Sequence, residues 1–177
     1  MDRYEELLAA ARAGTGLEDF GDDSFLEGLQ VLVRSLREEA QLNATGKHVL
    51  RQRIIGHLEQ RLEVEDWYRR HPEIDEVQIK APLIGVSLPR TGSPALSFLL
   101  AEDPDARSLR RWESSRPCPP PSTVTPPDPR IVQAQAGAAA RREGVKGHVP
   151  ESATGTAECE ELMERAFKSH LFKSFAR

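Results

Sequence analysis

The sequence is poor in cysteine and has no long hydrophobic run, and both absences exclude classes of protein. Only Cys118 and Cys159 occur in 177 residues, and no CxxC pair or Cys/His spacing predicts a zinc site. We therefore expect no metal, and reduced thiols as in a cytoplasmic protein. No apolar stretch approaches the roughly 20 residues that span a membrane, and the acidic, amphipathic N-terminus is unlike a secretory signal.

The chain also lacks an overall excess of positive charge. Its formal net charge is −4, so a nucleic-acid partner has no electrostatic support and none is expected. The charges are unevenly distributed: residues 1–80 hold 11 basic and 17 acidic residues, and residues 81–177 hold 13 and 11. The basic excess in the second part has the sign expected near an anionic ligand, although an ordinary solvated surface explains it as well.

Residues 1–80 predict an N-terminal helical region. Apolar residues recur at helical spacing over about residues 4–11, 25–40 and 46–68, which predicts three helices packed through their apolar faces. The glycines of GTG interrupt the first pattern, and a proline in HPE ends the third.

Residues 81–177 predict a different class of structure. PLIGVSL at 82–88 is short, apolar and β-branched, which is typical of a strand buried on both faces of a parallel sheet. The apolar residues of 95–100 predict a short helix after it. RSLRRW at 107–112 is only a weak second strand, and a parallel sheet needs several. We therefore expect an α/β fold with a partial parallel sheet.

Proline is concentrated in one stretch, since eight of the 13 prolines fall between residues 104 and 129. Such a stretch is either a flexible linker or a fixed extended segment packed over a site. Asp128 and Pro129 then predict the N-cap and first position of a helix. A last helix is predicted over about residues 157–175.

The turn LPRTGS at 88–93 is the candidate binding site. A buried strand, a glycine-containing turn and a helix N-terminus together form an anion site, because the first helical N–H groups lack partners. Gly92 would let the backbone approach a phosphate, Thr91 and Ser93 add hydroxyls, and Arg90 can bind two oxyanions. No Walker A sequence is present, and a turn without any ligand is the alternative.

LPRTGS resembles the phosphosulfate-binding loop of sulfotransferases, often written GxPRTGTT. Other segments resemble the large bacterial sulfotransferase family in the order that family has them: GLEDFGDDSFLEGL, RLEVEDWYRRHPEI, LLAEDPDARSLRRWE, PCPPP, DPRI and ATGTAECEELM. The resemblance implies a P-loop-like sulfotransferase domain whose front part is residues 81–177. It also implies 3′-phosphoadenosine 5′-phosphosulfate (PAPS) as sulfuryl donor, a small-molecule hydroxyl as acceptor, and no metal.

The resemblance also implies roles for individual residues. The donor would be bound by Pro89, Arg90, Thr91, Gly92 and Ser93. Arg90 would in addition be catalytic, because it can stabilise charge on the leaving phosphate. The acceptor hydroxyl needs a general base. Glu113 in RRWES is the first candidate, and the alternative is a glutamate that only caps a helix. His148 is the second candidate, and the alternative is an ordinary loop histidine.

Three departures from the family pattern affect this interpretation. Ser87 stands where the family usually has glycine, and Pro94 stands where it usually has a small hydroxyl residue. Pro94 removes an N–H group, which predicts weaker donor binding. Family chains are about twice as long, and their second part carries an arginine and serine pair for the 3′-phosphate. We therefore expect a truncated reading frame, a fragment or an artificial chain end.

Two other functions stay open at this point. The chain could be a non-catalytic remnant that binds anions or a protein partner. It could also be a kinase-like phosphoryl transferase, which requires a lysine and a Mg²⁺ ligand near the turn. Neither requirement is visible in the sequence.

Overall fold

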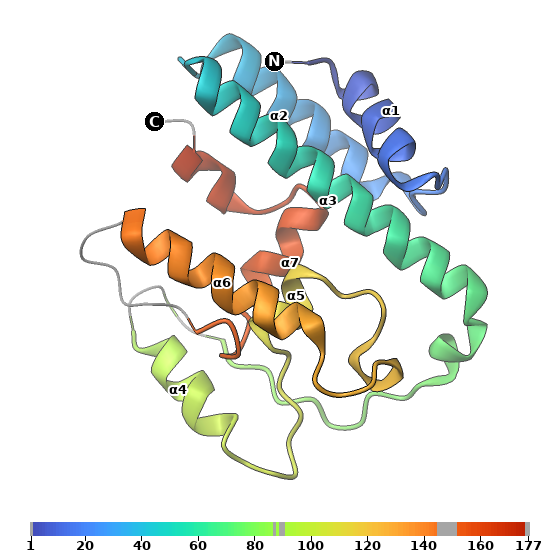
Figure 1. The fold of residues 1–177 in the computed structure, drawn as a ribbon, viewed down its shortest axis with the longest axis vertical. Coiled ribbons are helices and arrows are strands. Elements are labelled where there is room, and N and C mark those ends of the chain that lie inside the picture. The colour runs from blue at the N-terminus through green and yellow to red at the C-terminus, as the bar shows by residue number, and fades with distance from the viewer. Residues whose placement is uncertain (1, 87, 89–90, 145–151, 176–177) are drawn as a thin grey trace. The chain divides into compact units, whose positions relative to one another are not determined.

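The computed structural model describes residues 2–86, 88, 91–144 and 152–175, and these residues are mainly helical (Figure 1). They form two compact units, Met1–Pro72 with Cys159–Arg177, and Glu73–Glu158. The domain boundary predicted after residue 80 stays a prediction, because units defined by contacts need not coincide with domains. Within the described ranges, every helix is too short or too polar to cross a membrane.

The first unit contains the three helices predicted for the N-terminal region, and the structure confirms them. Its elements are α1 (Tyr4–Thr15), a 3₁₀ turn (Asp23–Phe25), α2 (Leu26–Glu38), α3 (Ala44–Arg70), α7 (Cys159–Arg165) and a second 3₁₀ turn (His170–Phe175). A further 3₁₀ turn, Pro72–Glu76, follows α3. α3 contacts both α1 and α7, so it is the element around which this unit is built.

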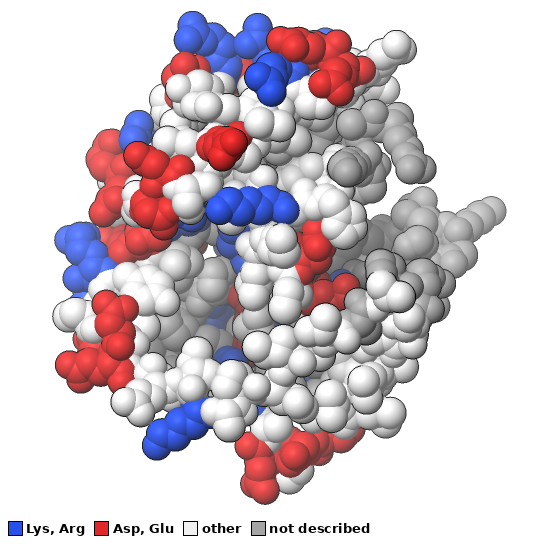
Figure 2. Space-filling view, turned by 180° about the vertical axis from the view of Figure 1, so that it is seen from behind, with Lys and Arg blue, Asp and Glu red and all other residues white. Residues whose placement is uncertain are grey.

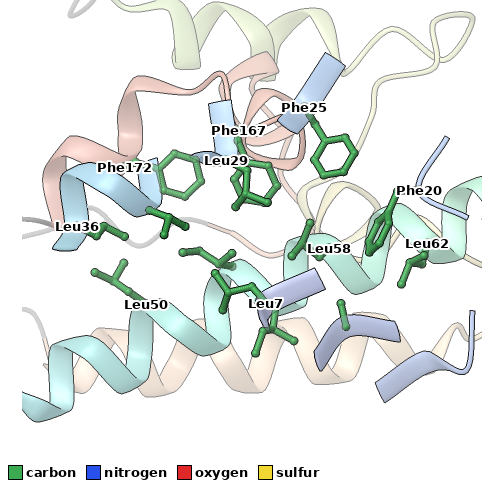
Figure 3. Close-up of a cluster of buried hydrophobic side chains, with 14 residues drawn as sticks. Leu7, Phe20, Phe25, Leu29, Leu36, Leu50, Leu58, Leu62, Phe167 and Phe172 are labelled. Carbon is green, nitrogen blue, oxygen red and sulfur yellow. The ribbon is translucent and has the colours of Figure 1, made fainter. Parts of the chain in front are cut away.

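The core of the first unit follows the four-residue spacing of α3. Leu50, Ile54, Leu58 and Leu62 recur every fourth position and are at most 3% exposed. Residues from α1, α2 and the C-terminal segment pack against this face, among them Leu7, Leu29, Phe167 and Phe172 (Figure 3). Burial of each such side chain contributes roughly 1.5–3 kcal/mol, so this face accounts for the stability of the unit.

The prediction of one last helix over residues 157–175 is wrong in its middle part. α7 ends at Arg165, Phe167 has a positive φ of 54°, and helical turns resume only at His170. The break brings Phe167 into the core, where it is 5% exposed. Gly28 of α2 permits this approach, since a Cβ there would lie 2.4 Å from the Phe167 carbonyl oxygen. Burial in the core has therefore overridden the local helical pattern.

α7 is attached to α3 by a buried carboxylate. Arg53 Nη2 donates to both oxygens of Glu164, at 2.7 and 2.8 Å, and His57 Nε2 lies 3.4 Å from Oε2. Burial raises the pKa of Glu164, but the interactions with His57 and Arg53 outweigh it and the net direction is downward. The buried carboxylate therefore stays ionised and fixes the end of the chain on α3.

The second unit contains helices separated by long extended segments. Its elements are α4 (Ser93–Leu100), α5 (Arg111–Ser115), a 3₁₀ turn (Pro121–Thr123) and α6 (Pro129–Gly144). The short helix predicted at 95–100 and the helix predicted to begin at Pro129 are confirmed.

The predicted α/β class with a partial parallel sheet is wrong, because the described residues contain no strand. Residues 82–86 and 88 are not buried: Leu83, Ile84 and Val86 are 79%, 70% and 91% exposed. Among the residues that the structure describes, RSLRRW forms one antiparallel bridge, between Arg110 and Thr156. A β-branched apolar segment forms a strand when neighbouring strands pair with it and its faces are covered, and the described part of the chain supplies no such neighbours.

Arg130 joins the C-terminal end of the proline-rich stretch to Arg116 and Trp112 within it. Asp128 Oδ1 accepts the Arg130 N–H at 2.9 Å, which caps α6, and its carboxylate also binds the Arg130 guanidinium. Arg130 Nη1 donates to the Arg116 carbonyl at 2.8 Å, and its guanidinium lies 5.0 Å from the Trp112 ring centre. The geometry favours the fixed segment over the flexible linker.

Candidate functional site

The turn before α4 is closed by a left-handed glycine and a hydroxyl contact. Gly92 has φ 88° and ψ 13° and is the N-cap of α4. Thr91 Oγ1 donates to the Leu88 carbonyl at 2.7 Å. Thr91 and Gly92 are exposed, and Ser93 is half-buried. Pro89 and Arg90, the other two residues predicted to bind the donor, lie outside the described residues.

The first turn of α4 presents backbone donors. The first intrahelical bond runs from the Leu96 N–H to the Gly92 carbonyl at 3.1 Å. The N–H groups of Ser93 and Ala95 precede this bond and have no intrahelical partner, while Pro94 between them has no N–H. Two donors and the positive end of the helix dipole therefore face the turn. This arrangement can bind one oxyanion.

α4 is supported from one side by residues 152–157. Ser97 Oγ and Thr156 Oγ1 are 2.8 Å apart. The Phe98 ring lies directly on Gly155, where a Cβ would come within 2.7 Å of its Cε1 atom. Only glycine allows this approach without displacing the ring, so Gly155 and Thr156 set the position of the helix that follows the turn.

The same segment also holds the start of α5. The N–H groups of Arg111 and Trp112 donate to the carbonyls of Gly155 and Ala153, at 2.8 and 3.1 Å. The Ala157 N–H donates back to the Leu109 carbonyl at 2.9 Å. Residues 153–157 are therefore bonded to α4 by side chains and to α5 by backbone.

Sequence reasoning assigned no role to this segment, although it belongs to the ATGTAECEELM stretch. The available signal was a glycine between two hydroxyl residues, Thr154 and Thr156. This pattern is compatible with close backbone approach. It does not reveal that the approaching partner is Phe98 of α4.

Glu113, the first candidate general base, lies in the first turn of α5 and is 8% exposed. Its Oε2 accepts the Arg110 N–H at 3.0 Å and the Arg107 Nη2 at 3.1 Å. The carboxylate thus caps α5, and Oε1 accepts no hydrogen bond within the described residues. Its catalytic role stays a prediction. His148, the second candidate, lies outside the described residues.

The described residues offer no cluster of His, Cys, Asp or Glu able to hold a metal ion. In its described part, the turn offers hydroxyl groups and backbone donors, and such a set can bind an anion. The buried carboxylate of Glu113 lies in α5, and among the described residues it accepts its hydrogen bonds from Arg107 and Arg110.

The chain is similar to known proteins in sequence and in structure. The sequence model described as "Sulfotransferase family" matches residues 82–177. The crystal structure of sulfotransferase STF1 from Mycobacterium tuberculosis H37Rv superposes with a TM-score of 0.80 at 31% identity, over 96% of this chain and 48% of that one. Sulfotransferase STF9 from Mycobacterium avium superposes with a TM-score of 0.87 at 27% identity, over 99% and 46%.

The search of curated proteins finds no match. The chain spans about half the length of the solved proteins it resembles. Both superpositions include the N-terminal helices as well as the region that the family model matches, because they cover nearly the whole of this chain.

Proposed function

The chain belongs to the sulfotransferase family, and from this premise we propose that it takes part in sulfuryl transfer from PAPS to a hydroxyl of a small-molecule acceptor. The turn at residues 88–93 is the proposed site for the 5′-phosphosulfate. PAPS supplies the activated sulfuryl group. The protein's residues would bind and orient the donor. They would also stabilise the negative charge that develops on the leaving phosphate and accept the proton of the acceptor hydroxyl.

One observation carries this proposal: the left-handed Gly92 directs an exposed turn into the N-terminus of α4. The Ser93 and Ala95 N–H groups precede the first intrahelical bond, so they are available to an oxyanion. The hydroxyl of Ser93 would add a third donor. Arg90 would offset the negative charge that develops on the leaving phosphate.

The acceptor hydroxyl must lose a proton as its oxygen bonds to sulfur. Glu113 is the proposed general base, because its Oε1 accepts no hydrogen bond among the described residues while Oε2 is fixed by the Arg110 N–H. A carboxylate held by one oxygen keeps its orientation and can use the other. His148 is the second proposed base.

A non-catalytic anion-binding remnant, or one that binds a protein partner, is the other candidate function. The observation that favours it is coverage, since this chain spans only 46–48% of the solved sulfotransferases. The two candidates differ in what they bind. A sulfotransferase recognises the whole nucleotide. A remnant of the first kind binds simple anions, and one of the second kind binds a protein partner, and neither binds the nucleotide.

Calorimetric titration with adenosine 3′,5′-bisphosphate, the desulfated product, tests the proposal. We expect saturable binding that is lost in Arg90→Ala and kept in Arg3→Ala, a control at a side chain 66% exposed. A parallel titration with sulfate separates the two candidates. Sulfate binding without nucleotide binding supports the remnant, and a folded chain that binds neither contradicts the proposed donor site.

A further inference from the structure

A group of arginines follows α4 in the second unit, and the proposed function uses none of their side chains. They are Arg107, Arg110, Arg111 and Arg116, and Glu113 is the only acidic residue between the first and the last of them. The chain as a whole has a net charge of −4, so this positive excess is local. Such a group is an ordinary solvated surface unless its geometry presents it to a ligand.

Positive charge is distributed over the surface in small groups. On the face that Figure 2 shows, Lys and Arg side chains form separate groups with uncharged areas between them. Attraction between such groups and an anion is screened by salt beyond about 10 Å. Recognition of an anion therefore depends on individual arginines and on the contacts that orient them, and the contacts of Arg107 and Arg110 are the ones to consider.

Arg107 and Glu113 form an ion pair that is buried on one side only. Arg107 Nη2 donates to Glu113 Oε2 at 3.1 Å. The Arg107 side chain is 67% exposed, whereas the Glu113 side chain is 10% exposed. The buried carboxylate therefore holds one nitrogen of a guanidinium that is otherwise largely open to solvent. An ion pair with so exposed a partner contributes little to stability, but it fixes where the guanidinium lies.

The Arg107 guanidinium keeps hydrogen-bonding capacity after this contact. It has five N–H donors in one plane, and in the described part of the chain Glu113 is its one hydrogen-bonded partner. A guanidinium with a free edge binds a carboxylate or a phosphate through two parallel hydrogen bonds. The Arg110 side chain has neither a hydrogen bond nor an ion pair among those residues, so its charge also remains available.

The carboxyl group that Arg107 binds is also the proposed general base. Glu113 Oε2 accepts from Arg107 Nη2 and from the Arg110 N–H at 3.0 Å, while Oε1 accepts no hydrogen bond among the described residues. A hydroxyl that donates to Oε1 therefore brings the rest of its molecule next to the Arg107 guanidinium. Glu113 by itself would repel an anionic molecule, and Arg107 offsets that repulsion.

We propose that Arg107 selects acceptors that carry an anionic group, a carboxylate or a phosphate, near the hydroxyl that receives the sulfuryl group. The inference rests on the proposed function, because Glu113 is the proposed base. The anionic group binds the free edge of the Arg107 guanidinium while the hydroxyl donates to Glu113 Oε1. Arg107 is then a specificity-determining residue, and a neutral acceptor leaves its guanidinium to water.

Binding of glycerol 3-phosphate, a small molecule with both hydroxyls and a phosphate, tests the inference. It is titrated without nucleotide into the isotope-labelled chain, and NMR follows the backbone signals of residues 107–114. We expect saturable shifts there, none with glycerol, and weaker binding of inorganic phosphate. Arg107→Gln should weaken binding of glycerol 3-phosphate roughly tenfold or more. Arg3→Gln is the matched control, because Arg3 is 66% exposed and also donates to a glutamate, at 3.2 Å, and it should leave binding unchanged.

Several results would overturn the inference: no binding, equal binding by the parent protein and Arg107→Gln, or equal affinities for glycerol 3-phosphate and inorganic phosphate. Binding that is lost in Arg90→Ala but kept in Arg107→Gln would also overturn it, because the phosphate would then occupy the donor turn. Titration with adenosine 3′,5′-bisphosphate tests the donor site separately. Nucleotide binding without glycerol 3-phosphate binding rejects only this inference, and the reverse result rejects only the donor site.

Discussion

Ser97 of α4 and Thr156, 59 residues further along the chain, meet through their hydroxyl groups at 2.8 Å. This contact fixes the helix that follows the candidate donor turn onto the segment that also holds α5. Because Phe98 packs on Gly155 at the neighbouring position, the turn rests on a support made by residues 152–157. The geometry of the proposed site thus depends on a distant part of the sequence.

The hydroxyl contact should be measurable as a coupling energy. Ser97→Ala and Thr156→Val each remove one partner, and we expect each to lower the free energy of unfolding by about 1 kcal/mol. The double variant should lose about 0.5–1 kcal/mol less free energy of unfolding than the two single variants together. The reason is that the second substitution has no hydrogen bond left to break. Urea unfolding of the four proteins gives the cycle. Strict additivity would show that the contact is not formed.

Gly92 should be replaceable only at a conformational cost. No atom lies within 4 Å of a Cβ built there, but its φ is 88°. Alanine in the left-handed region costs roughly 1–2 kcal/mol, so Gly92→Ala should destabilise the turn and weaken binding of adenosine 3′,5′-bisphosphate. Gly85→Ala is the control, because its Cβ also meets nothing and its φ is ordinary. Equal binding by the two variants would contradict the left-handed turn.

Pro94 should limit the affinity of the turn for an anion. Pro94→Ala restores an N–H between those of Ser93 and Ala95, and one additional hydrogen bond of about 1 kcal/mol corresponds to roughly fivefold tighter binding of adenosine 3′,5′-bisphosphate. Calorimetry on the two proteins measures this ratio. Unchanged or weaker binding would mean that the ligand does not contact this part of the helix.

Gly28 should be intolerant of any side chain. A Cβ there would lie 2.4 Å from the carbonyl oxygen of Phe167, so Gly28→Ala must displace the buried C-terminal segment. We expect a loss of about 1–3 kcal/mol in the free energy of unfolding. Gly56→Ala in α3 meets no atom within 4 Å and should instead stabilise by about 0.5–1 kcal/mol. Thermal unfolding compares the two, and similar shifts would contradict the close contact.

Asp128 should make stability depend on pH in the acid range. Hydrogen bonds from Arg130 lower the pKa of Asp128 below its ordinary value. The folded state therefore binds a proton at Asp128 less readily than the unfolded state does, and the ionised carboxylate stabilises the fold. This stabilisation is fully present above the ordinary pKa near 3.9, and it is lost as the pH falls through the lower pKa of the folded state.

Asp128→Asn keeps a side chain that can cap α6 but loses the carboxylate. It should be less stable than the parent protein at pH 7, and the difference in melting temperature should shrink as the pH falls below about 4. A difference that stays constant down to pH 2.5 would show that Arg130 does not stabilise the ionised form of Asp128.

The sequence by itself determined the three N-terminal helices, α4 and the start of α6. The periodic leucines of α3, the Asp128–Pro129 start of α6 and the glycine of LPRTGS are local signals, because a residue's own backbone preference or its neighbours three and four positions away carry them. The family resemblance, which rests on short motifs in a fixed order, was likewise visible in the sequence, and the comparisons confirm it.

The tertiary structure decided the rest, because those features depend on partners distant in the chain. Residues 82–88 have the composition of a buried strand, but the described residues offer no strand to pair with, so residues 82–86 and 88 stay exposed. Phe167 leaves the helical pattern because burial against α2 and α3 is worth more than another helical turn. Gly155 and Thr156 support α4 only once folding has brought two segments more than 50 residues apart into contact, and no local pattern encodes that approach.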